Sequence, residues 1–202
     1  MPTYSERFEA FLGNLLSSQK GRDAGLMTRL PPFDKIEPTL KVTSDIGPSE
    51  CSMPKQYAMD DNNEWPSLTW EKVPEAQEYF VVAEDADVPI PNPITHGFFY
   101  GISPEINSLQ EADLKEADTT NHTIKNGSIK YGKTMLRTVY SGPKPVRNHG
   151  PHRYFYTVVA LKQPLENVPA YPSKAELVKA VKEENILAWG EWIGVYERKL
   201  EQ

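Results

Sequence analysis

Proline and glycine interrupt almost the whole sequence, and this feature constrains the fold more than any other. The 202-residue chain carries 18 prolines and 12 glycines, spread along its length rather than gathered in one linker. Proline breaks an α-helix at interior positions, and both residues are typical of turns. A chain interrupted this often is not built mainly of long helices. The pattern predicts many short strands joined by turns.

Five segments between these breaks have the composition of β-strands, being rich in β-branched and aromatic residues. They are Leu40–Ser44, Ser67–Val73, Tyr79–Asp85, His96–Ser103 and Arg153–Leu161. The letters YFVVA in the third segment are apolar at successive positions, which predicts a strand covered on both faces. The letters LKVTS in the first alternate, which predicts one solvated face. The polar stretch Glu105–Ile129 has few bulky apolar residues and is expected to be a long surface excursion.

Helices are expected near the two ends of the chain. Thr3 and Glu6 have capping-box spacing, and apolar residues follow at helical intervals, which predicts an amphipathic helix packed on its own domain. Those apolar residues are Phe8, Phe11, Leu12, Leu15 and Leu16. A partner-binding helix is the alternative. Ser173 and Glu176 have the same spacing, and no proline follows up to Leu200, so we expect one helix there or two meeting near Asn185.

Composition and charge exclude several classes of protein. The net charge of −6 opposes nonspecific binding to nucleic acid or to an anionic membrane surface. No apolar segment is long enough to span a bilayer, and the first residues lack the features of a signal peptide. Cys51 is the only cysteine, which excludes an intramolecular disulfide and a cluster of thiolate ligands. We therefore expect a cytoplasmic protein that is not integral to a membrane and does not bind nucleic acid.

The acidic stretch Glu84–His96, with the letters EDADVPIPNPITH, has three possible roles: a metal loop, a solvated turn, or one wall of a ligand pocket. Carboxylates and imidazole are suitable ligands for divalent cations. The spacing does not match an EF-hand, and a zinc site formed by Asp85, His96 and His152 rests on no recognisable pattern. The alternate prolines stiffen this span and fix where its acidic side chains point.

A second informative stretch, Ser141–Leu161, contains a Gly-Pro-x-Pro turn, then the letters GPHRY, then a strong strand. His152 and Tyr154 lie two residues apart at the start of that strand. Their side chains should therefore share one face, with Arg153 on the other. A lone histidine at a strand end is usually structural. Two rigid proline-containing loops that each deliver a histidine beside a strand favour a ligand pocket.

Taken together and in order, these motifs resemble the signature of the phosphatidylethanolamine-binding protein family. They are Asp85–Pro89 (DADVP), His96-Gly97, Gly142-Pro143 and Gly150–Tyr154 (GPHRY), supported by Pro66–Trp70 (PSLTW) and Gly194–Arg198 (GVYER). The resemblance runs from Leu40 to Arg198, and the sequence of Glu84–Ser103 most resembles the fungal branch. It implies an antiparallel β-sandwich of Greek-key type. We expect a single domain over residues 1–202, with an N-terminal helical extension at 1–35 and a core at 40–198.

The resemblance also implies a small pocket that binds a phosphate-like anion. Its positions map onto Asp85, Asp87, His96, Gly142, Pro143, His152 and Tyr154. We expect the aspartates to accept the N–H of a histidine, raise its pKa and make it a cationic donor, with backbone N–H groups near Gly142 adding further donors. Ala86 and Ile94 depart from the family pattern, which leaves the headgroup preference open, and Lys144 beside the turn adds a cation. No metal and no cofactor are expected.

Three functions follow from the resemblance. The first is binding of a small anionic or phosphate-bearing ligand, with regulation of a kinase or protease as in some family members. The second is an enzyme of fungal secondary metabolism, acting with pathway enzymes such as those that make maleic-anhydride polyketide dimers. His152, His96 and Asp85 would then carry proton transfer, cyclisation or dimerisation. The third is a relative with a residual pocket. The sequence has no nucleophile elbow or phosphate-binding glycine loop, which favours binding over catalysis.

Overall fold

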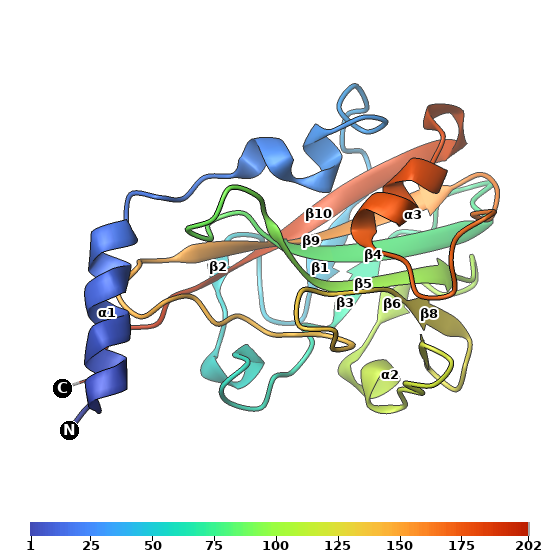
Figure 1. Ribbon diagram of the computed structural model, residues 1–202. Helices are drawn as coiled ribbons and strands as arrows, with labels where there is room; N and C mark the ends of the chain where they lie inside the picture. The colour runs from blue at the N-terminus through green and yellow to red at the C-terminus, as the bar shows by residue number, and fades with distance from the viewer. Residues whose placement is uncertain (202) are drawn as a thin grey trace.

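The computed structural model describes residues 1–201 and contains two β-sheets with short helices around them (Figure 1). The seven-stranded sheet has the order β2 (Cys51–Ser52), β10 (Ile186–Tyr196), β9 (His152–Leu161), β4 (Glu78–Asp85), β5 (Ile94–Ile102), β8 (Ile129–Tyr131) and β7 (Thr123–Ile124). The three-stranded sheet has the order β1 (Val42–Ser44), β3 (Leu68–Trp70) and β6 (Ser108–Leu109). Neighbouring strands are antiparallel except β2 and β10, which are parallel. The predicted mainly β class is confirmed.

Short helices occupy the connections between these strands. The α-helices are α1 (Tyr4–Leu16), α2 (Glu111–Lys115) and α3 (Lys174–Ala180), and the 3-10 helices are η1 (Asp23–Gly25), η2 (Met27–Arg29), η3 (Lys55–Tyr57) and η4 (Glu183–Asn185). The five predicted strands are all present, although two of them, β1 and β3, are shorter than expected. No helix within residues 1–201 has both the length and the apolar composition that crossing a bilayer requires.

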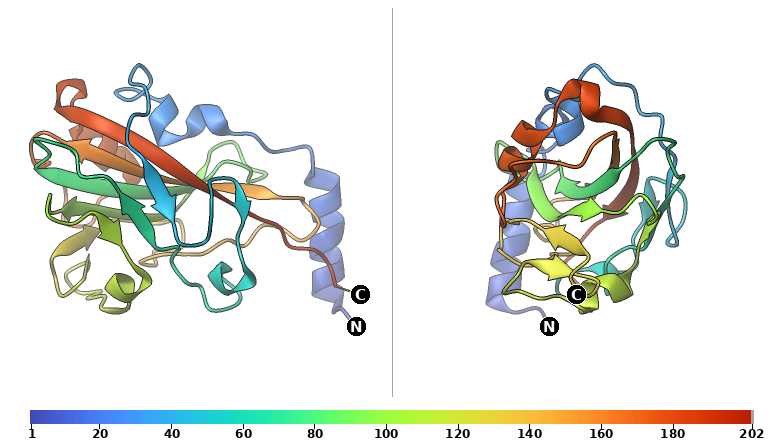
Figure 2. Two further views of the ribbon diagram at one scale, coloured as in Figure 1. Left: turned by 180° about the vertical axis from the view of Figure 1, so that it is seen from behind. Right: turned by 90° about the vertical axis from the view of Figure 1, so that its right-hand side faces the viewer.

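Strand β4 lies at the centre of the large sheet, and both of its faces are buried, as its sequence predicts. Tyr79 and Val81 join one apolar cluster, which also holds Trp70 of the small sheet. Phe80 alternates with them and joins a second cluster, which holds Leu177 of α3. The small sheet and α3 therefore cover opposite faces of the large sheet (Figure 2). The alternation predicted for Leu40–Ser44 is also present, since Leu40 and Val42 are buried while Lys41 and Thr43 are exposed.

The region Glu105–Ile129 is only partly the surface excursion that its polar composition predicts. Most of its residues are exposed or half-buried, but Leu109, Ile124 and Ile129 are fully buried. These three side chains belong to the same cluster as Tyr79. The short strands β6, β7 and β8 thus attach the segment to the core through single apolar residues.

The prediction of helices throughout the C-terminal segment is wrong after Ala180. Helix α3 begins at the predicted Ser173–Glu176 capping box but ends within two turns, and Ile186–Tyr196 forms the long strand β10. Strand β10 pairs with β9 along almost its whole length. Gly190 is unfavourable in a helix, and in the strand it allows the backbone of Leu40 to approach closely. Tertiary pairing therefore decides the conformation of a segment whose local pattern resembles a helix.

The two glycines of β10 offer a direct test of this packing. A Cβ atom at Gly190 would lie 1.8 Å from the backbone oxygen of Leu40, whereas at Gly194 the nearest atom is the flexible Met53 Sδ, at 2.4 Å. We expect Gly190→Ala to lower the free energy of unfolding by about 2–3 kcal/mol and Gly194→Ala by less than half of that. Urea denaturation of both variants measures the difference. Equal losses would contradict the packing described here.

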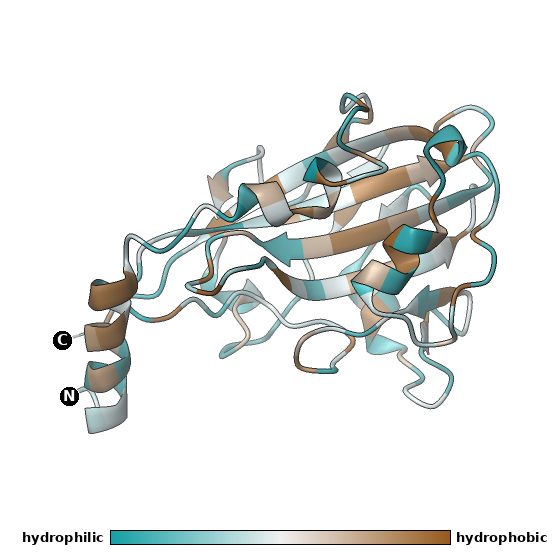
Figure 3. Ribbon diagram, turned by 45° about the horizontal axis from the view of Figure 1, so that its top comes forward, coloured by the Kyte–Doolittle hydropathy of each residue, from teal (hydrophilic) through white to brown (hydrophobic). Residues whose placement is uncertain are grey.

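Helix α1 is amphipathic and capped as predicted, but its apolar face does not pack on the domain. Thr3 and Glu6 form the reciprocal capping box. Ala10 and Gly13 are the buried positions, and a Cβ at Gly13 would lie 1.9 Å from the backbone oxygen of Arg147. The large apolar residues Tyr4, Phe8, Phe11 and Leu15 are 62–93 % exposed. The helix packs on its own domain as predicted, but the predicted face is wrong: it packs through small residues, which let the helix backbone approach this loop. Figure 3 shows α1 at the edge of the molecule, with apolar residues along it.

Candidate functional site

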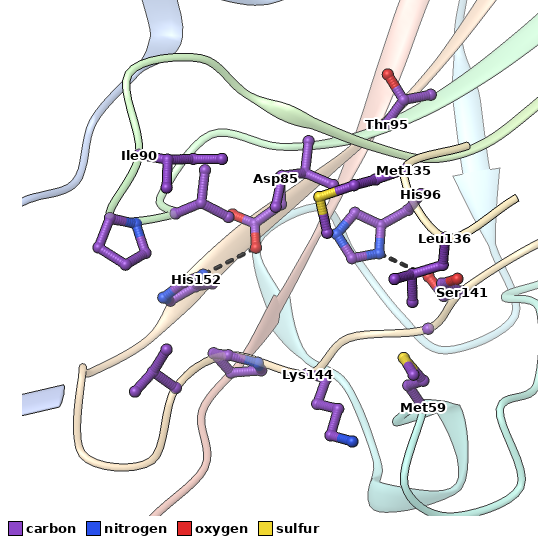
Figure 4. A pocket seen from close by; sticks show the side chains of 16 residues that line it. Met59, Asp85, Ile90, Thr95, His96, Met135, Leu136, Ser141, Lys144 and His152 are labelled. Carbon is purple, nitrogen blue, oxygen red and sulfur yellow. Dashed lines mark hydrogen bonds and ion pairs between the residues drawn. The ribbon is translucent and has the colours of Figure 1, made fainter. Parts of the chain in front are cut away.

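A cavity of about 340 Å³ lies where the C-terminal end of β4 meets the first residues of β5 and β9. The antiparallel register places Asp85 opposite Ile94 on one side and opposite Tyr154 on the other. Loops from Val88 to Ile94 and from Ser141 to Val146 supply the remaining walls (Figure 4). Most of the wall is apolar, including Met59, Val88, Ile90, Ile94, Met135 and Leu136. Such a cavity is large enough for a small organic ligand and is apolar in the way that ligand pockets usually are.

The structure brings four of the seven predicted site residues to the cavity wall, namely Asp85, His96, Gly142 and His152. Asp87, Pro143 and Tyr154 do not line it. The Pro143 carbonyl accepts the Met59 N–H at 2.9 Å and so fixes the wall loop. Tyr154 is buried behind the wall, edge-on to His96, with ring centroids 5.2 Å apart. Burial, and then the nearby Asp85, raise the pKa of Tyr154 well above its ordinary value, so its phenol stays protonated.

Asp85 and His152 form a buried pair at the floor of the cavity. Asp85 Oδ2 lies 2.8 Å from His152 Nδ1, and the two side chains are only 3 % and 1 % exposed. The other carboxylate oxygen, Oδ1, accepts the Asp87 N–H at 2.8 Å. The expected contact between a carboxylate and His152 is therefore present. Each oxygen of Asp85 still has a lone pair available for a ligand in the cavity.

A third histidine, which the sequence did not single out, extends this pair away from the cavity. His149 is completely buried; its Nδ1 lies 2.7 Å from His152 Nε2, and its Nε2 lies 2.9 Å from the Leu16 carbonyl at the end of α1. The only sequence signal for it is a second histidine on the other side of Gly150-Pro151. The four groups form a continuous chain from Leu16 through His149 and His152 to Asp85.

The directions of these hydrogen bonds fix where the protons lie. A carbonyl only accepts, so His149 Nε2 must carry a hydrogen for Leu16. Burial, and then the neighbouring His152, lower the pKa of His149, so this ring is neutral and its Nδ1 accepts from His152 Nε2–H. One proton then remains in the contact between His152 Nδ1 and Asp85 Oδ2, as an imidazolium–carboxylate pair or as an acid beside a neutral ring. Both His152 nitrogens are occupied by protein partners, so Asp85 is the member of the pair that can meet a ligand.

His96 has a different role from the one expected. Its Nδ1 lies 2.6 Å from the Ser141 carbonyl, so Nδ1 carries the hydrogen, while the buried Nε2 has no hydrogen-bond partner among residues 1–201. Burial lowers the pKa of His96, and the opposing charge of Asp85 does not offset it. The expectation of a cationic donor is wrong for His96 because its partner is a carbonyl rather than a carboxylate. At neutral pH its Nε2 is an acceptor in the cavity wall.

Asp87 points away from the cavity and does not contact a histidine, which corrects a second expectation. Its carboxylate accepts hydrogen bonds from the backbone of Gly21 and Arg153 and from the Arg153 guanidinium, at 2.8–3.0 Å. The same guanidinium also binds both oxygens of Asp23. The cause lies in the strand geometry, because Arg153 lies on the face of β9 opposite to His152. Asp87 therefore holds the N-terminal segment and β9 together.

Gly142 does not supply a free N–H donor to the cavity. Its N–H donates to Asn63 Oδ1 at 2.7 Å, so the expectation of an anion-binding backbone group at this residue is wrong. The glycine is needed for another reason: a Cβ here would lie 2.1 Å from the Tyr57 carbonyl. Lys144 is the cation of this loop, and it is exposed where it lines the cavity. The floor of the cavity consequently presents acceptors, with a cation nearer to solvent.

No group of three or more His, Cys, Asp or Glu side chains within the described residues is arranged to hold a metal ion. The zinc alternative of Asp85, His96 and His152 fails in this geometry because both His152 nitrogens and His96 Nδ1 are bound to protein groups.

A family model and two fungal relatives match most of this chain. A family model described as phosphatidylethanolamine-binding protein matches residues 43–197. A relative named phomoidride biosynthesis cluster protein B, from a fungal species, is 33% identical over 197 residues, covering 94% of this chain and 93% of its own. A protein of the same name from Talaromyces stipitatus is 33% identical over 195 residues, covering 93% of this chain and 80% of its own.

Solved structures agree with these sequence matches. Escherichia coli YbcL, described as a member of the mammalian PEBP family, superimposes with a TM-score of 0.66 at 25% identity, over 79% of this chain and 99% of its own. A PEBP homologue from Chlamydia trachomatis superimposes with a TM-score of 0.65, over 81% of this chain and 100% of its own. Its identity of 22% supports a shared fold only.

Proposed function

This chain belongs to the phosphatidylethanolamine-binding protein family, and on that premise we propose that it is an enzyme of fungal secondary metabolism that moves a proton on a small organic acid. The observation that carries the proposal is the buried Asp85–His152 pair, with Nδ1 and Oδ2 2.8 Å apart beside a mainly apolar cavity. The two fungal relatives that cover over nine-tenths of the chain are named as biosynthesis cluster proteins, which supports the pathway context.

The polarity of the cavity favours a ligand with an apolar body and a head that donates a hydrogen bond. The available polar atoms on the floor are the Asp85 oxygens and His96 Nε2, all of which accept. A carboxylic acid, an enol or an acidic C–H group supplies the matching donor. A phosphate dianion would instead face the charge of Asp85, and two like charges 4 Å apart repel by about 1 kcal/mol even in water and by more when buried.

The chemical step that this arrangement supports is reversible proton transfer to Asp85. The C–H bond next to a carbonyl group breaks, its proton moves to a carboxylate oxygen of Asp85, and the electron pair stays on the substrate as an enolate. His152 keeps the shared proton and so places a positive charge close to the enolate, which lowers the energy of the charged intermediate. The reverse transfer at another carbon completes an isomerisation or prepares the substrate for carbon–carbon bond formation. Positioned acids and bases of this kind typically contribute about 10²–10⁴-fold in rate.

Binding of a small anion is the second candidate function, and the exposed Lys144 beside the cavity is the observation that favours it. An anionic headgroup would meet this cation near solvent and would reach the floor only with a protonated, donating oxygen. Regulation of a kinase or protease stays a prediction from the family resemblance.

Isotope exchange distinguishes the two candidates. We expect the protein to accelerate exchange in D₂O of the alkyl protons of an alkyl-substituted maleic acid by about 100-fold or more over buffer alone. These protons lie on the carbon attached to the double bond, which conjugates them with the carbonyl group, so that their loss gives an enolate. Proton NMR measures this exchange, and the same spectra report perturbation of the His96 and His152 signals. Phosphoethanolamine is the matched ligand without an acidic C–H group. Tight phosphoethanolamine binding without exchange of the organic acid would contradict the enzyme and leave the binding protein.

A further inference from the structure

His149 is a buried titratable group that the proposed chemistry does not use. It does not line the cavity, yet it contacts His152 on one side and the last residue of α1 on the other. Leu16 and His149 are 133 residues apart in the chain, so this contact depends on how α1 docks. The docking in turn depends on Gly13, whose Cα faces the backbone of Arg147 and His149.

A buried histidine with only a packing role needs hydrogen-bond partners, but either ring nitrogen can be the donor. In His149 the two roles are fixed: its Nε2 must donate to the Leu16 carbonyl, which leaves its Nδ1 to accept from His152. Because His152 Nε2 is thereby required to carry a hydrogen, the tautomer of neutral His152 with its hydrogen on Nδ1 alone is disfavoured. Without His149 that tautomer becomes available, and it satisfies Asp85 with no shared proton.

We propose that His149 is a positioning residue that fixes the ring and the tautomer of His152, and that α1 controls the shared proton of the cavity through the Leu16 carbonyl. The expected effect of His149 on catalysis rests on the proposed function, whereas its effect on the protonation of His152 does not. Neutral His152 beside ionised Asp85 would lack the positive charge that stabilises an enolate.

The direction of the pH effect follows from the groups around the pair. Three titratable side chains surround the pair of His152 and Asp85: His149 from the loop before β9, His96 from β5 and Tyr154 from β9. Lys20, which follows α1, lies near the same loop. Tyr154 is a protonated phenol and His96 is neutral, so neither compensates for the loss of an acceptor at His149. Removing that acceptor makes the pair release its proton at lower pH.

Two substitutions of His149 separate its two hydrogen bonds. Asparagine places an amide oxygen near the position of Nδ1 and keeps the acceptor for His152, whereas glutamine places an amide nitrogen near Nε2 and keeps only the donor to Leu16. Nitrogen-15 NMR of histidine-labelled full-length protein, recorded from pH 5 to pH 9, reads the protonation of both His152 nitrogens. We expect His149→Asn to match the wild type. We expect His149→Gln to show an unprotonated Nε2 and a proton release at least one pH unit lower.

Helix docking is tested without changing any titratable group. Gly13→Ala adds a Cβ that would lie 1.9 Å from the Arg147 oxygen and displaces α1, while the control Asn14→Ala places alanine at the next position of the same helix, where the side chain is exposed. We expect Gly13→Ala to shift the His152 signals in the same direction as His149→Gln, and Asn14→Ala to leave them unchanged. These two helix variants also test the proposal if His149→Gln does not fold.

The outcomes for the two proposals are separable. Identical His152 signals in wild type, His149→Gln and Gly13→Ala would overturn the positioning role, whatever the activity. Altered signals in a protein that exchanges no substrate protons would support the positioning role and reject the enzyme. Where exchange is present, we expect His149→Gln to lower its rate about 10-fold or more and His149→Asn to stay within about 3-fold of wild type, with the pH profile displaced as in the spectra.

Discussion

Asp85→Asn is expected to lower the rate of substrate proton exchange by about 100-fold or more while the protein stays folded. The amide can keep each hydrogen bond of the carboxylate: its oxygen accepts the Asp87 N–H and its NH₂ group donates to His152 Nδ1. His152 then remains neutral, with its hydrogen on Nε2 for His149. The substitution removes only the ability to take up a proton and the shared proton itself.

Deuterium incorporation into the substrate measures this effect, and thermal unfolding checks the fold. The matched control is Asp87→Asn, which makes the same change two residues away at a carboxylate that does not line the cavity. Under conditions where both variants are folded, Asp87→Asn should keep the exchange rate within a few-fold of wild type. An Asp85→Asn variant as active as the wild type would exclude Asp85 as the acid or base. It would point to His96, whose Nε2 has no hydrogen-bond partner among the described residues.

Much of the fold could be predicted because its signals are local. Capping boxes at Thr3 and Ser173 involve residues three positions apart, and both are present. The continuous apolar run of β4 reports two buried faces without any knowledge of its neighbours. Strand β10 was missed since its residues suit a helix locally, and only pairing with β9 and close packing on Leu40 make it a strand.

The sequence indicated which residues lie close together but not their contacts. Asp85, His96 and His152 line one cavity, as expected if two rigid loops meet at the ends of neighbouring strands. Asp85 and Asp87 look equivalent in the sequence, yet one meets His152 and the other meets Arg153, because successive residues of β9 face opposite sides. Such partner choices depend on three-dimensional register, which a single sequence does not report.

The position of α1 shows the same limit more sharply. An apolar stripe on a helix normally marks the face that packs on the core. Here the helix packs through Gly13 and Ala10 and through ion pairs from Glu6 and Glu9 to Arg147, and the stripe remains outside. The contact between Leu16 and His149 follows from this docking, so the link from α1 to the cavity was not visible before the structure.

Asp87→Asn is expected to lower the free energy of unfolding by about 2–4 kcal/mol at neutral pH, because it disrupts four hydrogen bonds to a buried carboxylate. Asparagine accepts through one oxygen only, and its NH₂ group faces the donors of Arg153. Asp23→Asn is the matched control, since Asp23 binds the same guanidinium but its side chain is 42% exposed. The control should lose less than about 1 kcal/mol. Urea denaturation of the two variants measures both values, and equal losses would contradict the structural role of Asp87.

The pH dependence of this loss has a definite sign. Burial raises the pKa of Asp87, but the hydrogen bonds and charge of Arg153 and the Gly21 N–H outweigh it, so the pKa in the folded state lies below its ordinary value of 3.8. The stabilisation by ionised Asp87 is therefore complete above that value and is lost as the pH falls through the lower, folded pKa. The difference in stability between wild type and Asp87→Asn should be constant above about pH 5 and should shrink below about pH 4. A difference that stayed constant to pH 2 would show that the ionised carboxylate is not the source of the stability, and that the loss comes from the altered shape and donors of the amide.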